Sequence, residues 1–344
     1  MTTYRAYQVT GSRQFALVDR TVQPPAPGHV RLRVLTCGVC HSDAGAVDGH
    51  RDDPRQPVVP GHELVGIIEE VGDGVTTWQA GERVGVGYLG GNCGVCQQCR
   101  RGDFVNCTDQ PATGSTVDGG YAEVAYCRAS ALARIPEALN SLDAAPLLCA
   151  GLTVYNALRQ LDARPGSIVA VQGIGGLGHL AIQYADRIGY EVIAIGRGPE
   201  KASLAEQLGA SSYLDSASED PGQALQKRGG AAGIVATAAS GSSMSALIPG
   251  LAPRGQLLVV GIGQDPLNVS THDLVFGTRR ISGSLTGSSI ENEDSLTYAA
   301  TRGIRPMIEV MPLEQAPEAY QQMIKGKARF RMVLEITRSQ GKGK

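Results

Sequence analysis

Several features that mark other classes of protein are missing from this 344-residue sequence. It has no run of 18 apolar residues, so no segment is expected to span a membrane. Its start, MTTYRAYQVT, lacks the charged and apolar regions of a signal peptide, and we expect a cytoplasmic protein. No basic cluster is present and the net charge is −2, which argues against a nucleic-acid partner. Aromatic residues make up only 5% of the chain, too few to identify a small-molecule ligand.

Glycine and cysteine, in contrast, are abundant, with 45 and 8 residues. The many glycines, together with 42% hydrophobic residues, favour a compact α/β or β-rich protein with tight turns. The length predicts about two domains. Cysteines outside a secretory context favour metal binding over disulfides.

The pattern of apolar residues changes along the chain and predicts an α/β fold. Before residue 150, short β candidates separated by Gly and Pro dominate: residues 29–35, 63–71, 83–87 and 120–127. From residue 167, apolar strands alternate with helical segments, which predicts βαβ units and a doubly wound parallel sheet. The expected strands there are 168–172, 191–196, 233–237, 255–260 and 280–285, with helices at 176–188, 199–208 and 242–250. A helix at 315–325 and a strand at 330–336 are expected near the end.

Four cysteines lie close together in a glycine-rich segment and predict a structural zinc site. Their spacing is C-x2-C-x2-C-x7-C, formed by Cys93, Cys96, Cys99 and Cys107. Four thiolates complete a tetrahedral shell around Zn²⁺ and leave no open position for catalysis. Disulfides or a four-iron cluster are the alternatives.

A dinucleotide-binding motif follows the strand expected at 168–172. It is G-x-G-x-x-G, with Gly173, Gly175 and Gly178, and a helical pattern comes directly after it. Such glycines allow a tight turn and close backbone approach, and the pyrophosphate lies at the helix N-terminus. The alternative is a glycine-rich structural turn.

The end of the next strand indicates which cofactor binds. An acid at this place bonds the ribose 2′-hydroxyl of NAD. The strand instead ends in Gly196 and Arg197, with Lys201 nearby. Gly196 leaves room and the two cations can neutralise a 2′-phosphate, so the sequence favours NADP(H) over NAD(H). If both cations are only solvated, NAD(H) is the expected cofactor.

Three further pieces indicate a catalytic metal site. They are the segment Cys37–Asp43, the triplet Gly61–Glu63, and Cys149 at the end of the β-rich region. Two thiolates and an imidazole leave the fourth position on zinc open, which is typical of a catalytic site. Each piece alone is a weak signal.

In combination, these motifs resemble the zinc-dependent medium-chain alcohol dehydrogenase family, and the resemblance extends over the whole chain. It is carried by G-V-C-H-S-D, G-H-E, the four-cysteine segment and G-x-G-x-x-G, in this order. It implies a GroES-like catalytic domain formed by residues 1–150 and 287–344, with a structural zinc lobe at about 85–110. It also implies a Rossmann nucleotide-binding domain at 151–286.

The resemblance assigns roles around the metal. It implies that Cys40, His62 and Cys149 bind the catalytic zinc and that Glu63 approaches the metal during ligand exchange. Asp43 is expected to orient His62.

Substrate and cofactor contacts are implied in the same way. Ser42 is expected to bond the substrate oxygen and start the proton path, and Tyr88 to form an aromatic wall of the substrate pocket. Thr153 matches a position beside the nicotinamide, and Arg331 one near the pyrophosphate and Asp43. The full set of implied cofactor contacts is His41, Thr153, Gly173, Gly175, Gly176, Leu177, Gly178, Gly196, Arg197, Lys201, Gly261, Ile262 and Arg331.

Some residues depart from the family pattern or match no ligand position. Gly45 stands where some members carry a histidine that passes the proton to solvent, and His50 is a candidate substitute. Cys37 forms C-x-x-C with Cys40, which suggests either a redox dithiol or a buried small side chain. Cys127 is expected to be structural.

The resulting hypothesis is a homodimeric or homotetrameric enzyme with two zinc ions per chain. It interconverts alcohols with aldehydes or ketones, using NADP(H). One alternative is an NAD(P)H-dependent C=C or imine reductase on the same scaffold, favoured by Gly45. The other is a non-enzymatic zinc- and nucleotide-binding redox sensor.

Overall fold

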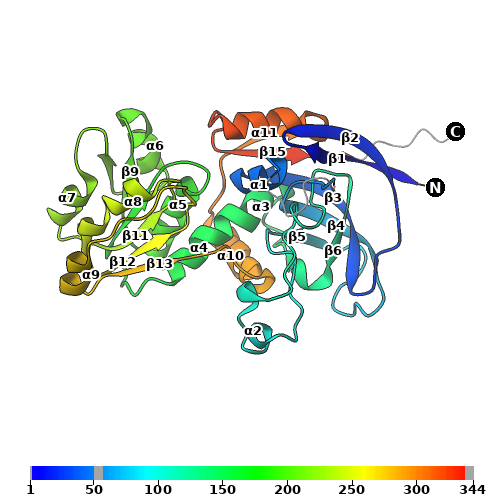
Figure 1. The fold of residues 1–344 in the computed structure, drawn as a ribbon, viewed down its shortest axis with the longest axis horizontal. Coiled ribbons are helices and arrows are strands. Elements are labelled where there is room, and N and C mark those ends of the chain that lie inside the picture. The colour runs from blue at the N-terminus through cyan, green and yellow to red at the C-terminus, as the bar shows by residue number, and fades with distance from the viewer. Residues whose placement is uncertain (1, 50–56, 338–344) are drawn as a thin grey trace. The chain divides into compact units, whose positions relative to one another are not determined.

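The computed structural model of the chain describes residues 2–49 and 57–337 and divides into two units (Figure 1). The first unit comprises Met1–Leu152, Thr286–Ala300 and Pro306–Lys344. The second comprises Thr153–Leu285 and Thr301–Arg305. The first unit is therefore built from both ends of the chain.

A seven-stranded mixed sheet is the centre of the first unit. Its order is β14-β15-β3-β4-β5-β7, with β6 also paired to β3. β14 and β15 are parallel, and the other pairs are antiparallel. The strands are β3 (His29–Val39), β4 (Glu63–Val71), β5 (Arg83–Val86), β6 (Val124–Arg128), β7 (Leu132–Arg134), β14 (Ile308–Pro312) and β15 (Arg331–Glu335).

A hairpin of β1 (Thr3–Gly11) and β2 (Gln14–Thr21) adds a separate two-stranded sheet that the sequence pattern did not predict. The strand expected at 120–127 begins only at residue 124. The reason is that Gly120 and Tyr121 donate backbone hydrogen bonds to Gly61 and Pro60 instead of pairing with β3.

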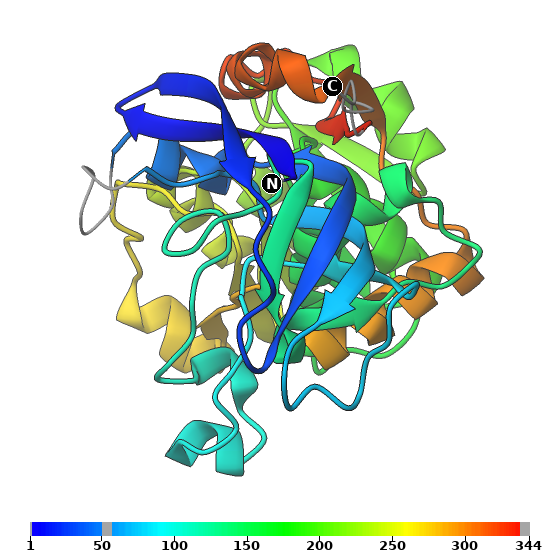
Figure 2. The same cartoon turned by 90° about the vertical axis from the view of Figure 1, so that its right-hand side faces the viewer.

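The strands of the first unit are connected by mostly short helical segments. They include η1 (His41–Asp43), α1 (Ala44–Val47), α2 (Gln97–Arg100), η2 (Phe104–Asn106), η3 (Ala129–Ala131), α3 (Ser141–Pro146), the π-helical turn η4 (Leu147–Gly151), η7 (Leu313–Gln315) and α11 (Ala316–Ile324). α10 (Ser289–Arg302) crosses the boundary between the units in sequence. Figure 2 shows the cysteine segment with α2 standing apart from the strands of its own unit.

The second unit contains a six-stranded, fully parallel sheet. Its order is β10-β9-β8-β11-β12-β13, which is the order 3-2-1-4-5-6 of a dinucleotide-binding fold. The predicted α/β fold class is confirmed. The strands are β8 (Ile168–Gln172), β9 (Glu191–Gly196), β10 (Ser212–Asp215), β11 (Ala231–Ala236), β12 (Leu251–Val259) and β13 (Arg280–Gly283).

Except for the helix that precedes β8, the helices of this unit connect consecutive strands, as parallel pairing requires. They are α4 (Leu152–Arg159), α5 (Gly178–Ile188), η5 (Pro199–Lys201), α6 (Ala202–Gln207), α7 (Pro221–Gln226), α8 (Gly241–Ser245), η6 (Ile248–Gly250) and α9 (Thr271–Gly277). α5 turns buried Leu180, Ala181 and Tyr184 inward, and the central strands are buried along their length. Within the described ranges, no helix is both long and apolar enough to cross a lipid bilayer.

Candidate active site and metal centres

Four metal-binding side chains from separate parts of the first unit meet in its interior. One ligand atom from each of Cys40, His62, Glu63 and Cys149 lies within 4.8 Å of the others. The Sγ atoms of Cys40 and Cys149 are 4.0 Å apart. The group therefore surrounds a space suited to one metal ion.

Local structure explains how the four side chains converge. Cys40 directly follows the long strand β3, and His62 directly precedes β4, the antiparallel neighbour of β3. Glu63 opens β4 opposite Gly38 in the register. Cys149 lies in η4, where the helix widens into a π turn after Pro146, and such turns are frequent at functional sites.

Asp43 fixes the orientation of His62 in this cluster. One carboxylate oxygen lies 2.8 Å from His62 Nδ1, and the other accepts from the Cys40 backbone N–H and the Tyr121 hydroxyl, each at 2.9 Å. In the neutral imidazole, this carboxylate favours the proton on Nδ1, so that the lone pair lies on Nε2. His62 Nε2 is buried and has no hydrogen-bond partner within the described part of the chain.

Glu63 forms a buried ion pair with Arg331 of β15. Both side chains are almost completely shielded from solvent. A Cβ atom at Gly38 would overlap the Glu63 carboxylate, so glycine at this position gives the acid its space. The family resemblance implies only that Arg331 lies near Asp43 and the pyrophosphate, and the ion pair with Glu63 is a further finding of the structure.

The ionisation of these groups is strongly coupled. The contact between the Cys40 and Cys149 thiols lowers the pKa of Cys40 well below its ordinary value and raises the pKa of Cys149. Burial opposes a charged imidazole, but Asp43 and then Cys40 raise the pKa of His62 well above normal. Burial raises the pKa of Glu63 to about 7, although Arg331 acts in the opposite direction.

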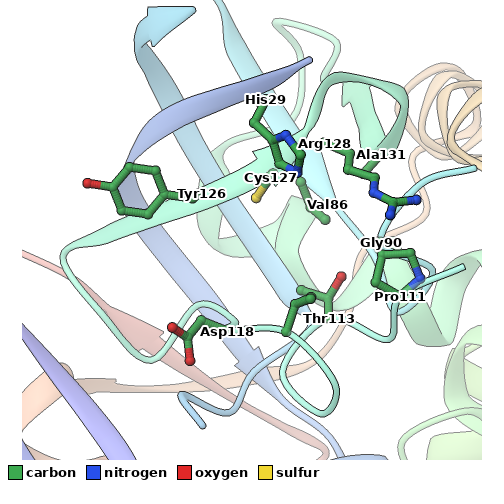
Figure 3. Close-up of a pocket in the computed structure, with 11 residues that line it drawn as sticks. His29, Val86, Gly90, Pro111, Thr113, Asp118, Tyr126, Cys127, Arg128 and Ala131 are labelled. Atoms are coloured by element: carbon green, nitrogen blue, oxygen red, sulfur yellow. The ribbon is translucent and has the colours of Figure 1, made fainter. Parts of the chain in front are cut away.

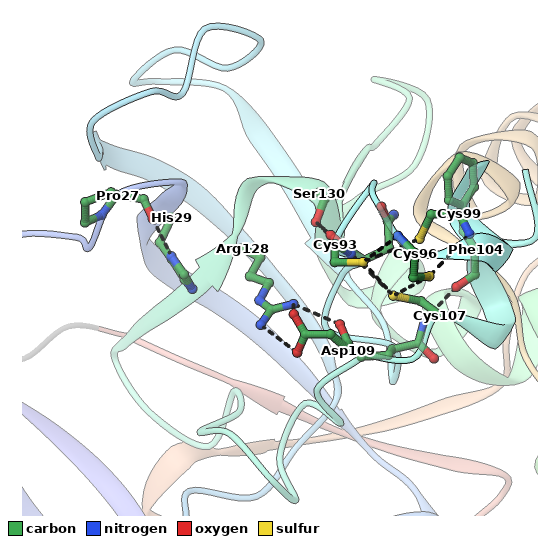
Figure 4. A network of polar contacts seen from close by, with 12 residues as sticks. Pro27, His29, Cys93, Cys96, Cys99, Phe104, Cys107, Asp109, Arg128 and Ser130 are labelled. Carbon is green, nitrogen blue, oxygen red and sulfur yellow. Dashed lines mark hydrogen bonds and ion pairs between the residues drawn. The ribbon is translucent and has the colours of Figure 1, made fainter.

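The four cysteines of the second cluster also converge, as Figure 4 shows. The Sγ–Sγ distances are 3.6 Å for Cys93–Cys107 and 4.0 Å for both Cys93–Cys99 and Cys96–Cys107. A tetrahedral zinc with Zn–S bonds near 2.3 Å requires sulfur atoms about 3.8 Å apart. A disulfide requires about 2.05 Å, and all four are free thiols, so the disulfide alternative does not describe this structure.

Backbone amides lower the pKa of Cys93 and Cys96 in this lobe, whereas burial raises the pKa of Cys99 to about 12. The Cys93 N–H donates to Cys107 Sγ at 3.4 Å, and the Cys96 N–H donates to Cys93 Sγ at 3.4 Å. The Cys99 N–H donates to Cys96 Sγ at 3.5 Å. The Cys99 amide is the main reason that the pKa of Cys96 falls to about 6.

Two contacts join the lobe to β6 and η3. Ser130 Oγ donates to the Asn92 carbonyl at 3.0 Å and accepts a hydrogen bond from the Asn92 N–H. Arg128 pairs with Asp109, just after the last cysteine (Figure 4).

A separate pocket of about 120 Å³ lies on the same unit (Figure 3). Thr113 Oγ1 is buried there without a hydrogen-bond partner among the described residues. The Cys40–His62 cluster does not line this pocket. Its lining residues are His29, Val86, Gly90, Pro111, Thr113, Val117, Asp118, Tyr126, Cys127, Arg128 and Ala131.

The glycine motif of the second unit forms the turn between β8 and α5. Gly173 has a positive φ of 88°, which favours glycine. A Cβ at Gly178 would overlap the Gly173 carbonyl, whereas a Cβ at Gly175 would meet no atom within 4 Å. The turn therefore leaves its Gly175 side open to a ligand.

The remaining predicted residues have diverse surroundings. Tyr88 packs edge-on against the His62 ring, with centroids 5.3 Å apart. His41 and Ser42 are exposed on η1, Thr153 is buried on α4, and Ile262 is 84% exposed. The backbone of Gly261 packs closely against that of Ala238. Gly176 and Leu177 belong to the glycine turn. His50 lies outside the described residues.

Cys37 and Cys127 lie outside both clusters. Cys37 Sγ contacts the tightly packed backbone at Gly61 and Gly120, and burial raises the pKa of its thiol well above normal. Burial likewise raises the pKa of Cys127 to about 12. Both are thus inert thiols in this structure.

Comparison with known proteins identifies the domains. Residues 26–137 match the family model "Alcohol dehydrogenase GroES-like domain", and residues 176–301 match "Zinc-binding dehydrogenase". A nucleotide-binding sheet joined to a unit with two metal-binding clusters defines a metal-dependent dehydrogenase.

Similar proteins cover nearly the whole chain. Alcohol dehydrogenase notN of Aspergillus sp. (strain MF297-2) is 41% identical, covering 92% of this chain and 93% of its own. An alcohol dehydrogenase of Geobacillus stearothermophilus is 40% identical, covering 90% and 92%. The solved cinnamyl alcohol dehydrogenase SbCAD4 of Sorghum bicolor is 32% identical, covers 97% of this chain and 98% of its own, and has a TM-score of 0.87.

The chain therefore belongs to the zinc-dependent medium-chain alcohol dehydrogenase family. The resemblance inferred from the sequence is confirmed, as is the class of enzyme, an oxidoreductase that acts on alcohols.

Proposed function

We propose that this enzyme interconverts primary or secondary alcohols with aldehydes or ketones, using NADP(H) and a zinc ion held by Cys40, His62 and Cys149. The observation that carries the proposal is the buried, unpaired Nε2 of His62 facing two cysteine sulfurs. A buried imidazole nitrogen without a partner is costly unless a ligand accepts its lone pair.

The donor set fits a catalytic zinc site. Two thiolates and one imidazole are typical zinc ligands, and they leave a fourth position for a water molecule or substrate. Glu63 supplies a carboxylate beside this position, and Arg331 holds that carboxylate back in an ion pair.

Bound zinc supplies Lewis-acid polarisation of the substrate oxygen, and the nicotinamide accepts or returns a hydride. The residues of the chain orient the metal ligand His62 and accept the substrate proton. Asp43 holds the His62 ring through Nδ1, and Tyr121 and the Cys40 amide hold Asp43. We assign the substrate proton to Ser42 Oγ, which is exposed two residues after Cys40. Tyr88 packs on His62 and forms an apolar wall beside it.

We also propose a structural zinc on Cys93, Cys96, Cys99 and Cys107. The sulfur spacing matches the edge of a ZnS₄ tetrahedron and leaves room for one ion, not for a multi-iron cluster. The count is then two zinc ions per chain.

The preference for NADP(H) rests on the turn after β9. Arg197 is exposed, and Lys201 Nζ donates to the Ile174 carbonyl of the glycine turn at 3.0 Å, which holds its charge at the cofactor motif. Asp215 ends β10 beside this turn, and its Oδ1 accepts from the N–H groups of Gly198 and Ala217 at 2.7 and 2.9 Å. This carboxylate is therefore engaged by the backbone, while the two cations suit a 2′-phosphate.

A homodimer or homotetramer is part of the proposal. Large apolar side chains are exposed on the second unit, among them Val275 and Phe276 of α9, at 72% and 80%. We assign the subunit contact to α9, since exposed apolar surface is typical of protein contacts. Light scattering during gel filtration gives the mass that tests this assignment.

Initial rates with benzaldehyde and cinnamaldehyde, with NADPH and NADH in parallel and zinc measured on the same sample, test the proposal. We expect two zinc ions per chain, reduction to the alcohol and a preference for NADPH. Saturation of the C=C bond of cinnamaldehyde would instead support the reductase alternative. Lack of turnover despite bound zinc and NADPH would support the sensor.

Cys40→Ala should abolish turnover and remove one zinc while the circular dichroism spectrum stays unchanged. Cys127→Ala is the matched control, because Cys127 is also a buried thiol but lies outside both clusters. Turnover by zinc-loaded Cys40→Ala would contradict the ligand assignment.

A further inference from the structure

Gly196, at the end of β9, is confined by one side chain of the neighbouring strand. A Cβ atom at this position would lie 2.9 and 3.0 Å from two ring carbons of Tyr213 and closer still to its hydroxyl oxygen. Real Cβ atoms essentially never approach other atoms so closely. The backbone of Gly196 does not have a positive φ, so its conformation would accept any residue. The three atoms nearest to such a Cβ all belong to Tyr213, so a side chain at position 196 requires Tyr213 to move.

The Tyr213 side chain is itself held in place. Its hydroxyl donates to the Gly198 carbonyl at 2.5 Å, across the turn that follows β9. Gly198 has φ 80° and ψ 159°, a region that is almost exclusive to glycine. Its N–H donates to Asp215, two residues after Tyr213 on the same strand. The turn and the tyrosine therefore fix each other, and Tyr213 cannot move aside without breaking this network.

This arrangement bears directly on cofactor choice. Position 196 is where an NAD-binding site of this fold carries the acid that bonds the ribose 2′-hydroxyl. An acid at 196 would need the space that Tyr213 occupies. It would also bring a negative charge to the place where a 2′-phosphate would bind.

We propose that Tyr213 is a specificity-determining residue, which excludes every side chain from position 196 and so keeps the site open to a 2′-phosphorylated cofactor. This inference rests on the proposed use of NADP(H) and deepens it. A change of preference toward NADH then requires two substitutions, one at 196 and one at 213. Gly196 and Tyr213 act as a pair.

A double-mutant cycle on stability tests the steric part without any cofactor. Gly196→Ala adds only the Cβ atom, and we expect it to lower the melting temperature by about 2–8 °C. In the Tyr213→Ala background the same change should have little effect. Tyr213→Phe removes only the hydroxyl and leaves the two ring carbons, so it should relieve part of the loss. An equal effect of Gly196→Ala in all three backgrounds would overturn the proposal.

Equilibrium binding tests the cofactor part. Fluorescence titration of NADPH and NADH is done with the wild type, Gly196→Asp, Tyr213→Ala and the double variant, all zinc-loaded. We expect Gly196→Asp alone to gain little affinity for NADH, and the double variant to bind NADH about tenfold tighter than Gly196→Asp does. An equal gain in the single and double variants would overturn the role of Tyr213.

The two proposals fail in different ways. If the wild type binds NADH more tightly than NADPH, the proposed cofactor preference fails, while coupling in the melting temperatures still supports the steric pair. If the wild type prefers NADPH but the cycle shows no coupling, the preference stands and Tyr213 has no part in it. Should Gly196→Asp not fold alone but fold together with Tyr213→Ala, that rescue supports the inference.

Discussion

Replacing Asp43 by asparagine should separate metal affinity from the fold. The native carboxylate accepts three hydrogen bonds, from His62 Nδ1, the Cys40 N–H and the Tyr121 hydroxyl. An amide of the same shape has one acceptor oxygen and one NH₂ group, so it cannot accept hydrogen bonds both from His62 and from the Cys40 N–H and Tyr121 hydroxyl.

Each orientation of the new amide has a definable cost. If its oxygen faces Tyr121 and the Cys40 N–H, its NH₂ faces His62 Nδ1. The imidazole then carries its proton on Nε2, the nitrogen that should bind zinc. If the oxygen faces His62, the buried Cys40 N–H meets an NH₂ group and remains unsatisfied, at a cost of about 1–3 kcal/mol.

We expect Asp43→Asn to weaken binding of the catalytic zinc by about 10–100-fold, the usual effect of losing the partner of a ligating histidine. Competition with a chromophoric chelator measures this affinity, since the catalytic and lobe sites should release zinc in separate steps. Glu123→Gln is the control, because Glu123 is equally buried but pairs with Arg5. If Asp43→Asn retains wild-type zinc affinity, or if Glu123→Gln weakens it equally, the orienting role of Asp43 is refuted.

Three further predictions concern stability and cofactor binding. Cys99→Ala should lose one zinc and lower the melting temperature, whereas turnover per remaining zinc changes little; an unchanged melting temperature would count against a structural metal. Arg331→Met leaves Glu63 buried without its partner and should destabilise the protein by about 3–5 kcal/mol in urea unfolding. Adding Glu63→Gln should restore much of that loss, and no restoration would show that the ion pair is not the cause. Gly178→Ala should impair folding, because its Cβ overlaps the Gly173 carbonyl, while Gly175→Ala should fold with an unchanged melting temperature and bind NADPH more weakly in a fluorescence titration.

Local patterns in the sequence predicted those elements whose signal is periodic. Alternation over residues 29–35 marked β3, and the apolar run 168–172 followed by spaced glycines marked β8 and its turn. The β1–β2 hairpin has no such signal, because its turn uses Arg13 at φ 57° in place of Gly or Asn. α10 was missed because its buried residues include Asn292 and Ser295, which do not form an apolar stripe.

The candidate site was predictable to the extent that residue type and spacing specify it. The spacing of the cysteines predicted the cluster of four cysteines, and cysteines together with His62 predicted the catalytic cluster. The contacts that hold the catalytic cluster in place were not predictable in this way, because they join distant segments: Tyr121 with Asp43, and Arg331 with Glu63. A single sequence contains no periodicity that links such positions.

The position of β15 has a consequence for the order in which the enzyme matures on the ribosome. β15 pairs with the half of β3 that leads into Cys40, and it delivers Arg331 to Glu63. All the proposed zinc ligands are synthesised long before this strand. Until β15 emerges, that half of β3 has an open edge and the buried acid has no counter-charge. A chain that stops short of β15 would thus contain every proposed ligand residue but lack the strand beside β3 and the Arg331 partner of Glu63.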